Sequence, residues 1–488
     1  MEKIDLPLDL TGTKIHFVGI KGTGMTALVE ILYGRGAEIS GSDVAERFYT
    51  DEILDKLKIK PKLFSEDNVD KSISLVIYSS AYSLENNADL KKANELKIPL
   101  LQYAEALGLV SASSYSAGIC GVHGKTTTTG MTGTLLEELP LESSALAGSI
   151  IASFGNKCTM VKGNKYFVAE TCEYQRHFMN FHPQKIILTS VESDHQDFYP
   201  TYADIRNAFV DYVLKLPAGG DLIYCADDSG AREVAEIAKK SRPDINFISY
   251  GENACGDFKI EFGKIANGRQ YFNVSSLGEF FIRVPGRHNV RNATAALALS
   301  CRILQQDKKN PLNYIENLKA GLEKFAGGKR RSEITGHKKN SLGQDIIFID
   351  DYAHHPTAIK TTLAGYREFY GKHKIIVDFM SHTYSRTQAL LEEFAASFES
   401  ADEVIINKIY ASARESSAGF TVTGELLAEH AKKYKKDVYY EGEFEAAAKK
   451  ALSLLEEDSG AKYPEGYLFV TMGAGDNWKV ANLVQEQL

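Results

Sequence analysis

The sequence predicts an α/β protein of three domains, each built around a mainly parallel sheet. Short apolar runs typical of buried strands alternate with helical stretches along the chain, which favours parallel sheets joined by helices. The chain has 488 residues, and domains commonly hold about 100–200 residues, so three domains account for its length. A Ser- and Ala-rich stretch at 108–116 suggests a linker, and a polar run at 327–331 suggests a second boundary. The predicted domains are 1–110, 111–327 and 328–488.

Strands are predicted at short runs of apolar and β-branched residues, with helices between them. The stretch 258–284 alternates polar and apolar residues between turns, which predicts a small antiparallel patch in the central domain. An alanine-rich helix is predicted at 286–304. The expected strands are 15–20, 37–42, 75–79 and 99–101 in the first domain, 116–120, 166–169, 185–189, 221–225 and 247–250 in the second, and 346–349, 374–379, 403–406, 438–440 and 467–472 in the third.

Composition narrows the class of protein. The formal net charge is −8, which argues against a general nucleic-acid binder, because such proteins need a dense basic surface. The six cysteines are widely spaced with no C-x-x-C pair, a pattern typical of reduced thiols. We find neither a secretory signal nor a run of about 20 apolar residues that could span a membrane. These features predict a cytoplasmic protein, and they leave small anionic molecules possible as ligands.

A glycine-rich turn follows the first predicted strand. Gly19, Gly22 and Gly24 would let the backbone approach a phosphate, and Asp43 lies about 20 residues on, like the ribose-binding acid of a dinucleotide fingerprint. Lys21, however, replaces the middle glycine of that fingerprint. The turn therefore indicates a nucleotide without deciding which one.

The strongest single signal is the run GVHGKTTT at 121–128, which follows a predicted strand. Its glycines let the backbone N–H groups and the next helix N-terminus surround an anion. Lys125 would neutralise the β and γ phosphates of ATP, and the Thr126 hydroxyl would coordinate Mg²⁺. The strict phosphate-binding loop has a glycine where this chain has Ile119, so the loop is a variant. The predicted nucleotide-binding residues here are Gly121, His123, Gly124, Lys125, Thr126 and Thr127.

Two further residues are candidate metal ligands. Glu170 ends one predicted strand of the central domain, and His195 follows the next. Parallel sheets present ligands at these strand ends, and Mg²⁺ prefers carboxylate oxygens. A single His on a loop is more often structural, so the residues alone leave the role of His195 open.

Nine motifs occur one after another along the chain, in the order HFVGIKGTGM, GVHGKTTTT, SVESDHQDFY, GRHNVRNA, GGKRRSE, DDYAHHPT, SHTYSRT, KIYASARE and MGAGD. On these residues the chain resembles the Mur ligases over essentially its whole length. The resemblance implies a Rossmann-like first domain that binds a UDP-sugar and a central domain of P-loop ATPase type that binds ATP. It implies a Rossmann-like third domain that binds the amino acid. The implied reaction uses ATP and Mg²⁺ to join L-alanine to the lactyl carboxylate of UDP-N-acetylmuramate through an acyl phosphate, in peptidoglycan synthesis.

The resemblance also implies roles for single residues. Lys125 would be catalytic, with His195 or His354 as the base, and Thr126, Glu170 and His195 would hold metal ions. His288, Asn289, Asn292, Arg331 and Asp351 would contact ATP, Gly19, Gly22, Gly24, Asp43, Ser79 and Ser80 the UDP-sugar, and Tyr352, His354, His382 and Arg386 the amino acid.

Some positions depart from the family pattern. Cys172 stands where many members have an Asp, Ser190 where they often have Asn, and Thr383 where many carry an Arg. The change at Thr383 bears on the choice of amino acid more than on ATP chemistry. The nearest alternative is a recycling ligase that adds a tripeptide to the same UDP-sugar. A regulatory protein without catalysis and a dinucleotide-dependent oxidoreductase are weaker alternatives, and a monomer or a homodimer is expected.

Overall fold

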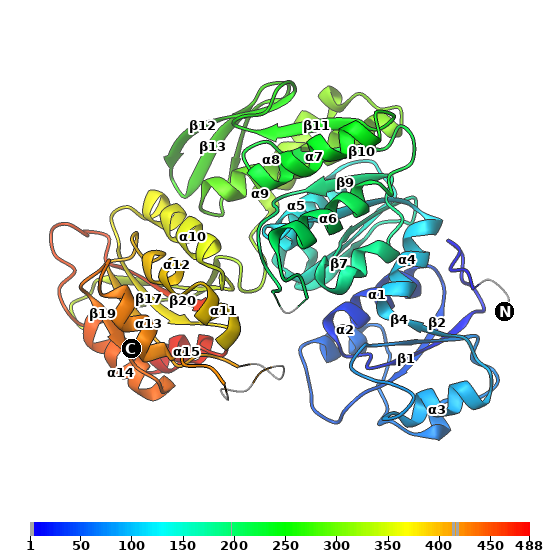
Figure 1. Cartoon of the computed structure of the whole chain (residues 1–488), viewed down its shortest axis with the longest axis horizontal. Helices are drawn as coiled ribbons and strands as arrows, with labels where there is room; N and C mark the ends of the chain where they lie inside the picture. Colours follow the sequence, from blue (N-terminus) through cyan, green and yellow to red (C-terminus); the bar gives the residue numbers. More distant parts are fainter. Residues whose placement is uncertain (1–3, 197, 412–414, 416–418) are drawn as a thin grey trace. The chain divides into compact units, whose positions relative to one another are not determined.

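The computed structural model describes residues 4–196, 198–411, 415 and 419–488, and it confirms the α/β class (Figure 1). Its strands form three sheets. The chain divides into two compact units, one of Met1–Phe262, Phe272–Phe281 and Arg291–Ala326, the other of Gly263–Tyr271, Ile282–Val290 and Gly327–Leu488. The domain boundaries at 110 and 327 remain predictions.

The first sheet has four parallel strands in the order β2-β1-β3-β4. The stretch 108–116 is not the predicted linker, because α4 fills most of it and leads into the next sheet. A capping box between Gln102 and Glu105 starts this helix, and its apolar residues Leu107 and Val110 are buried. The elements are β1 (Lys14–Val18), α1 (Thr23–Gly34), β2 (Glu38–Ser42), α2 (Thr50–Lys56), β3 (Leu75–Tyr78), α3 (Ala88–Glu95), β4 (Leu100–Gln102) and α4 (Tyr103–Ser113).

The second sheet has ten strands in the order β14-β13-β12-β11-β10-β9-β5-β8-β6-β7. At its centre β5 pairs in parallel with β8 and β9, so the loops after these three strands leave the same edge. Strands β6 and β7 were not predicted. The strands are β5 (Tyr115–Cys120), β6 (Ser143–Ile151), β7 (Lys157–Val161), β8 (Tyr166–Glu170), β9 (Lys185–Leu188), β10 (Asp221–Cys225), β11 (Asn246–Gly251), β12 (Phe258–Ala266), β13 (Arg269–Val274) and β14 (Gly278–Ile282), and the helices are α5 (Lys125–Glu138), α6 (Tyr202–Val213), α7 (Ser229–Ser241), α8 (Arg287–Gln306) and α9 (Ile315–Lys324).

The predicted antiparallel patch is formed by β12, β13 and β14. Two residues, Asn267 (φ 54°) and Gly268 (φ 67°), join β12 to β13. Both have positive φ, as a type I′ turn requires, and a two-residue loop joins only antiparallel neighbours.

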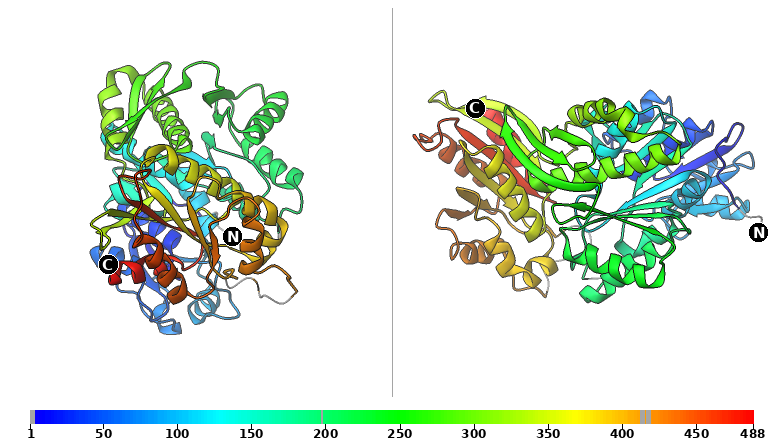
Figure 2. Two further views of the ribbon diagram at one scale, coloured as in Figure 1. Left: turned by 90° about the vertical axis from the view of Figure 1, so that its left-hand side faces the viewer. Right: turned by 90° about the horizontal axis from the view of Figure 1, so that it is seen from above.

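The third sheet has the order β15-β16-β20-β17-β18-β19, parallel except for the unpredicted β15. Helices cover both faces (Figure 2), and each face has its own apolar core. The elements are β15 (Glu333–Lys339), β16 (Asp345–Asp351), α10 (Pro356–Phe369), β17 (Lys374–Met380), α11 (Tyr384–Ala389), α12 (Leu391–Ala396), β18 (Glu403–Ile406), α13 (Gly424–Ala431), β19 (Val438–Tyr440), α14 (Phe444–Leu455), β20 (Tyr467–Gly473) and α15 (Trp478–Gln487).

Within the part of the chain that the structure describes, none of the helices has the length and apolar character needed to cross a bilayer. All six cysteines are free thiols.

Candidate active site

The glycine-rich loop between β5 and α5 packs too tightly for larger residues. Gly121 has φ 133° and Gly124 has φ 80°, conformations that favour glycine. A Cβ added at Gly121 would lie 2.1 Å from Thr189 Oγ1, and one at Gly124 would lie 2.6 Å from Asn292 Oδ1. The loop backbone is thus held against the end of β9 and against α8. The structure brings Asn292, predicted as an ATP contact, to this loop.

Lys125, the first residue of α5, folds back over the loop. Its ammonium donates a hydrogen bond to the Gly121 carbonyl at 2.6 Å and pairs with Glu173 Oε1 at 3.0 Å. Burial, the largest single influence, would lower the pKa of Lys125, but the negative groups around it, Glu173 foremost and then Cys172 and Glu170, together raise it above its ordinary value. The residue is therefore a fixed cation beside backbone N–H groups that can hold phosphate.

Glu173 is the acid that the sequence analysis did not assign to the site. Its side chain is only 2% exposed, and its Oε1 lies 3.6 Å from His195 Nε2 as well as near Lys125. Burial tends to raise its pKa, but Lys125 and then His195 hold it below the ordinary carboxyl value. Glu173 therefore joins two predicted catalytic residues in one network. The second acid of the ETCEY stretch was the signal for it.

Glu170, the predicted metal ligand at the end of β8, is held by β6. Its Oε2 accepts a hydrogen bond from the Gly148 N–H at 2.7 Å, and a Cβ on Gly148 would collide with this carboxylate. Glu170 also lines a cavity of about 160 Å³ whose other walls include Gly24, Tyr103 and Phe178. Its carboxylate thus reaches the space between the first sheet's helices and the second sheet.

The residues near the loop provide some, but not all, of the ligands predicted for a magnesium ion. Thr126 is buried in the first turn of α5, and Glu170 ends the neighbouring strand, so both offer oxygen atoms at one sheet edge. His195 lies instead beside Glu173. Among residues 4–196, 198–411, 415 and 419–488, neither Glu170 nor His195 belongs to a group of three His, Cys, Asp or Glu side chains close enough to share an ion. The predicted ligand roles remain proposals.

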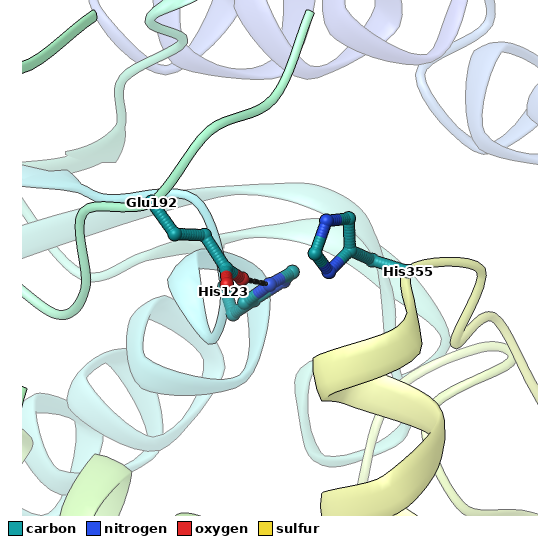
Figure 3. Close-up of side chains that lie close together, drawn as sticks. All are labelled: His123, Glu192 and His355. Carbon is teal, nitrogen blue, oxygen red and sulfur yellow. Dashed lines mark hydrogen bonds and ion pairs between the residues drawn. The ribbon is translucent and has the colours of Figure 1, made fainter. Parts of the chain in front are cut away.

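His123 is fixed by the loop that follows β9. Its backbone N–H donates to Ser190 Oγ at 2.9 Å, and its Nε2 contacts the Glu192 carboxylate (Figure 3). The His123–Glu192 contact was not predicted. The neighbouring Thr127 is partly exposed.

The start of α8 belongs to the second unit, which contains His288 and Asn289. The Asn289 side chain donates to the Pro285 carbonyl at 2.7 Å, and the His288 ring packs on Gly286. Contacts of these two residues with ATP therefore stay predictions.

The two arginines of KRRSE have different environments. Arg330 Nε pairs with Asp350 at 2.9 Å, and its guanidinium also donates to the carbonyls of Gly473 and Gly475 at 2.8 and 2.9 Å. Arg331 stacks over the Tyr352 ring at 5.0 Å. Arg330 is thus engaged within its own unit, which leaves Arg331 as the better candidate for a phosphate contact.

Asp351 is buried and holds its own loop. Its Oδ2 accepts from the Ser332 N–H at 2.7 Å and the Tyr366 hydroxyl at 3.2 Å, and its Oδ1 accepts from the Ala353 N–H at 2.9 Å. These bonds give it a structural role beside the predicted contact with the nucleotide ribose.

The structure brings the four predicted amino-acid ligands together. The Tyr352 and His354 rings lie 5.0 Å apart, and the His354 and His382 rings 6.1 Å apart. The buried Arg386, in α11, donates to the His382 carbonyl at 2.8 Å. Tyr410 of KIYASARE packs against His382, with ring centroids 5.7 Å apart. Ser412–Arg414 of that motif lie outside the described residues.

The glycine turn of the first sheet shows why a lysine replaces the fingerprint glycine. Asp43 accepts a hydrogen bond from the Lys21 N–H at 2.7 Å, and Lys21 Nζ donates to the Glu46 carbonyl at 2.7 Å. The side chains of Asp43 and Lys21 therefore fix the position of the segment that follows β2. A Cβ on Gly19 would meet the Tyr82 ring at 2.7 Å.

The remaining predicted sugar-nucleotide residues surround the same turn. Gly22 precedes α1, and Gly24 faces Tyr103. The Ser79 N–H bonds to the Val18 carbonyl at 3.1 Å, and Ser80 is exposed.

Comparisons with known proteins agree with this arrangement. Three family models match, the catalytic domain of the Mur ligase family at 14–115, the Mur ligase middle domain at 119–300 and the Mur ligase glutamate ligase domain at 330–475. A UDP-N-acetylmuramate–L-alanine ligase of Treponema pallidum is 47% identical over 487 residues, covering 99% of this chain and 98% of the relative. One of Borrelia garinii is 37% identical over 470 residues, covering 95% and 97%.

Two solved structures share the fold. A UDP-N-acetylmuramate–alanine ligase of Thermotoga maritima has a TM-score of 0.72 at 25% identity and covers 97% of this chain and 98% of its own. A murein peptide ligase of Psychrobacter arcticus has a TM-score of 0.62 at 20% identity, with the same coverage of 97% and 98%. The family models, the relatives and the shared fold together place the chain in one group: it belongs to the Mur ligase family.

Proposed function

We propose that this chain is an ATP-dependent ligase that joins L-alanine to the lactyl carboxylate of UDP-N-acetylmuramate. The observation that carries the proposal is the buried Lys125–Glu173 pair, with its 3.0 Å contact, inside a glycine-rich loop at a helix N-terminus. The relatives from Treponema and Borrelia, which bear the name of this activity, support the choice of substrates. The cytoplasmic location and the oligomeric state remain predictions from the sequence.

The loop and Lys125 would bind the phosphates of ATP. Backbone N–H groups of the loop and of the first turn of α5 would donate to the phosphates, and the Lys125 ammonium would turn from Glu173 towards the β and γ phosphates. Magnesium bound by Thr126 and Glu170 would reduce the repulsion between phosphate and carboxylate. Glu173 would hold Lys125 in its charged form between turnovers.

The proposed chemistry has two steps. A lactyl carboxylate oxygen attacks the γ phosphorus, the bond to the β-phosphate oxygen breaks, and ADP leaves. The amine of L-alanine then attacks the acyl carbon, and inorganic phosphate leaves with the oxygen that came from the carboxylate. The products are the amide, ADP and phosphate.

The amine must lose one proton during the second step. His195 and His354 are both proposed as the base, and they differ in setting. His195 lies 3.6 Å from Glu173, a carboxylate that can stabilise an imidazolium, whereas His354 Nδ1 contacts the Tyr352 carbonyl at 2.9 Å. The structure therefore favours His195.

The carboxyl end of β17 supports a single amino acid as the second substrate. The buried Arg386 lies beside His382 and could hold an α-carboxylate through paired hydrogen bonds. The ligase that adds a tripeptide to the same UDP-sugar remains the alternative, because the fold is shared by a murein peptide ligase as well.

Labelling of the lactyl carboxylate with ¹⁸O tests the acyl phosphate directly. The enzyme is incubated with ATP, L-alanine and the labelled UDP-sugar, and the released phosphate is analysed by mass spectrometry. We expect one ¹⁸O in each phosphate, with the other retained in the amide. Phosphate without label would contradict the proposed route.

A further inference from the structure

Three loops of the second unit leave the same edge of the third sheet. Strands β17, β18 and β20 are parallel neighbours, so the segments after Met380, Ile406 and Gly473 lie at their shared carboxyl end. The first of these loops contains His382, the second Tyr410, and the third is the MGAGD loop. Any group that fixes these three strand ends also fixes the half of the predicted amino-acid patch that follows β17, namely His382 and Arg386.

Asp378 occupies the centre of this edge. Its Oδ2 accepts a hydrogen bond from Asn407 Nδ2 at 3.0 Å, and its Oδ1 accepts one from Asn477 Nδ2 at 3.2 Å. Asn407 follows β18 and Asn477 begins the turn into α15, so the carboxylate ties the ends of three strands together. All three side chains are fully buried at 0% exposure. We call Asp378, Asn407 and Asn477 the Asp378 cluster.

The cluster bonds to the backbone as well. Asn477 Nδ2 also donates to the carbonyls of Asp378 and Met472, both at 3.0 Å. Asn407 Nδ2 reaches the Glu441 carbonyl at 3.4 Å, which adds the segment after β19. Single amide groups thus link neighbouring strand ends in addition to the main-chain hydrogen bonds there, such as that from the Asn407 N–H to the Phe379 carbonyl.

A row of polar residues continues from the cluster across the sheet. Thr471 of β20 is the register partner of both Asp378 and Asp350, so the three side chains leave the same face. Thr471 donates to Asp350 at 3.0 Å, and Asp350 pairs with Arg330, which also binds the carbonyls of the MGAGD loop. The row therefore fixes that loop from a second side.

The three loops touch one another directly beyond the cluster. The Tyr410 N–H donates to the Ser381 carbonyl at 2.8 Å, next to His382. A Cβ added at Gly475 would lie 2.4 Å from the Met380 sulfur and 3.1 Å from Tyr410 Cβ. With so little clearance, a shift of any strand end moves the other two loops.

We propose that the Asp378 cluster is a positioning element that sets the affinity of the enzyme for its amino acid. This inference rests on the proposed function, because it takes the His382 and Arg386 patch as the amino-acid site. Asp378 does not touch the substrate. It holds the strand ends from which His382, Tyr410 and the MGAGD loop extend. The position of such groups matters, because a shift of about 1 Å in a residue that binds the substrate can lower the rate about a hundredfold.

Replacement of Asp378 by Leu, which has a similar size and no polar atoms, tests the proposal. The Asp378→Leu variant leaves the amides of Asn407 and Asn477 without their shared acceptor. We expect KM for L-alanine to rise about tenfold or more, while KM for ATP and for UDP-N-acetylmuramate stays within about twofold of the original enzyme. A general loss of structure would instead change all three KM values or lower the yield of folded protein.

The conservative variant Asp378→Asn provides the rescue. The oxygens of Asn407 and Asn477 have no hydrogen-bond partner among the described residues, so one amide can rotate and accept from the new Asn amide. We expect this variant to restore KM for L-alanine to within about threefold of the original enzyme. If Asp378→Leu does not fold, Asn407→Ala and Asn477→Ala replace it, each with the same expected rise in KM for L-alanine.

Asn340→Ala is the matched control. Asn340 is a buried amide of the same unit whose Nδ2 donates to the Leu455 carbonyl at 2.8 Å, but it precedes β16 and so lies at the amino end of the sheet. Its loss should lower the melting temperature without changing KM for L-alanine. An unchanged KM for L-alanine in the cluster variants, or an equal rise in the Asn340 variant, would overturn the inference. Failure of the original enzyme to use any amino acid would instead overturn the proposed function.

Discussion

Replacement of Lys125 by Ala separates the chemistry of the phosphate loop from its stability. The Lys125 side chain is 14% exposed and the Glu173 side chain 2%. The variant would leave the buried Glu173 carboxylate without its cation. Breaking a buried ion pair in this way commonly lowers the free energy of unfolding by about 3–5 kcal/mol. Glu173 can limit this cost by taking up a proton. At pH 7 a carboxyl with the ordinary value of 4.5 is neutralised at a cost of about 3 kcal/mol.

The loss of stability should therefore be about 3 kcal/mol at pH 7 and smaller at pH 5, where the proton binds more easily. Turnover should fall at least about a hundredfold, because the charge that develops on the transferring phosphate loses its fixed cation. Thermal melting and phosphate release measure the two effects in the same preparation.

The double variant Lys125→Ala with Glu173→Gln makes the experiment decisive. The neutral Gln removes the stranded charge, so stability should recover while turnover stays low. Lys185→Ala is the matched control, because Lys185 pairs with the buried Asp221 at the opposite end of the same sheet. It should lower stability and leave turnover per folded molecule unchanged. Turnover by the double variant within tenfold of the original enzyme would refute the role of Lys125.

Three further predictions concern the loop, the base and the buried acid. Gly124→Ala should raise KM for ATP, because Ala is strained at φ 80° and its Cβ would lie 2.6 Å from Asn292 Oδ1; steady-state kinetics measures this, and an unchanged KM would contradict the packing. His195→Gln should slow amide formation about a hundredfold or more, measured as amide produced at saturating substrates, whereas His354→Gln should keep most of the rate; the reverse would assign the base to His354. Burial raises the pKa of Asp378 to about 7, so the folded state keeps a proton that the unfolded state releases above about pH 4. The contribution of Asp378 to the free energy of unfolding therefore falls as pH rises from about 4 to about 7, by up to about 4 kcal/mol. The Asp378→Asn variant does not titrate, so its gain in melting temperature over the original enzyme should grow from pH 5 to pH 8. A difference that stays constant with pH would refute this prediction.

Local sequence predicted the elements whose signal is contained in one apolar run. The strands at 221–225, 403–406 and 438–440 have the predicted bounds in the structure. The first two runs are almost wholly buried, whereas only Val438 of the third is buried. The linker expected at 108–116 was wrong, since Ser and Ala also suit a helix once Leu107 and Val110 have a core to contact. Strand β6 was missed because its small residues Ser, Ala and Gly carry no strand periodicity.

The site residues also divide into those that a local motif predicted and those that only the fold brought together. Lys125 and the loop glycines follow from one motif, because spacing along the chain fixes their geometry. Glu173 was missed as the partner of Lys125, because 48 residues separate them and only folding brings β8 beside β5. The sequence did not indicate a role for Asp378, because a single acid in an apolar strand is not distinctive. Its role depends on the amides of Asn407 and Asn477, which only the fold brings to it.

Phosphate release from ATP with UDP-N-acetylmuramate tests the central claim most directly. The assay compares no amino acid, L-alanine, glycine, L-serine and the tripeptide. The proposed function predicts release that depends on L-alanine, in a ratio of one phosphate to one amide. Release that responds to the tripeptide and not to L-alanine would contradict it and identify the recycling ligase instead.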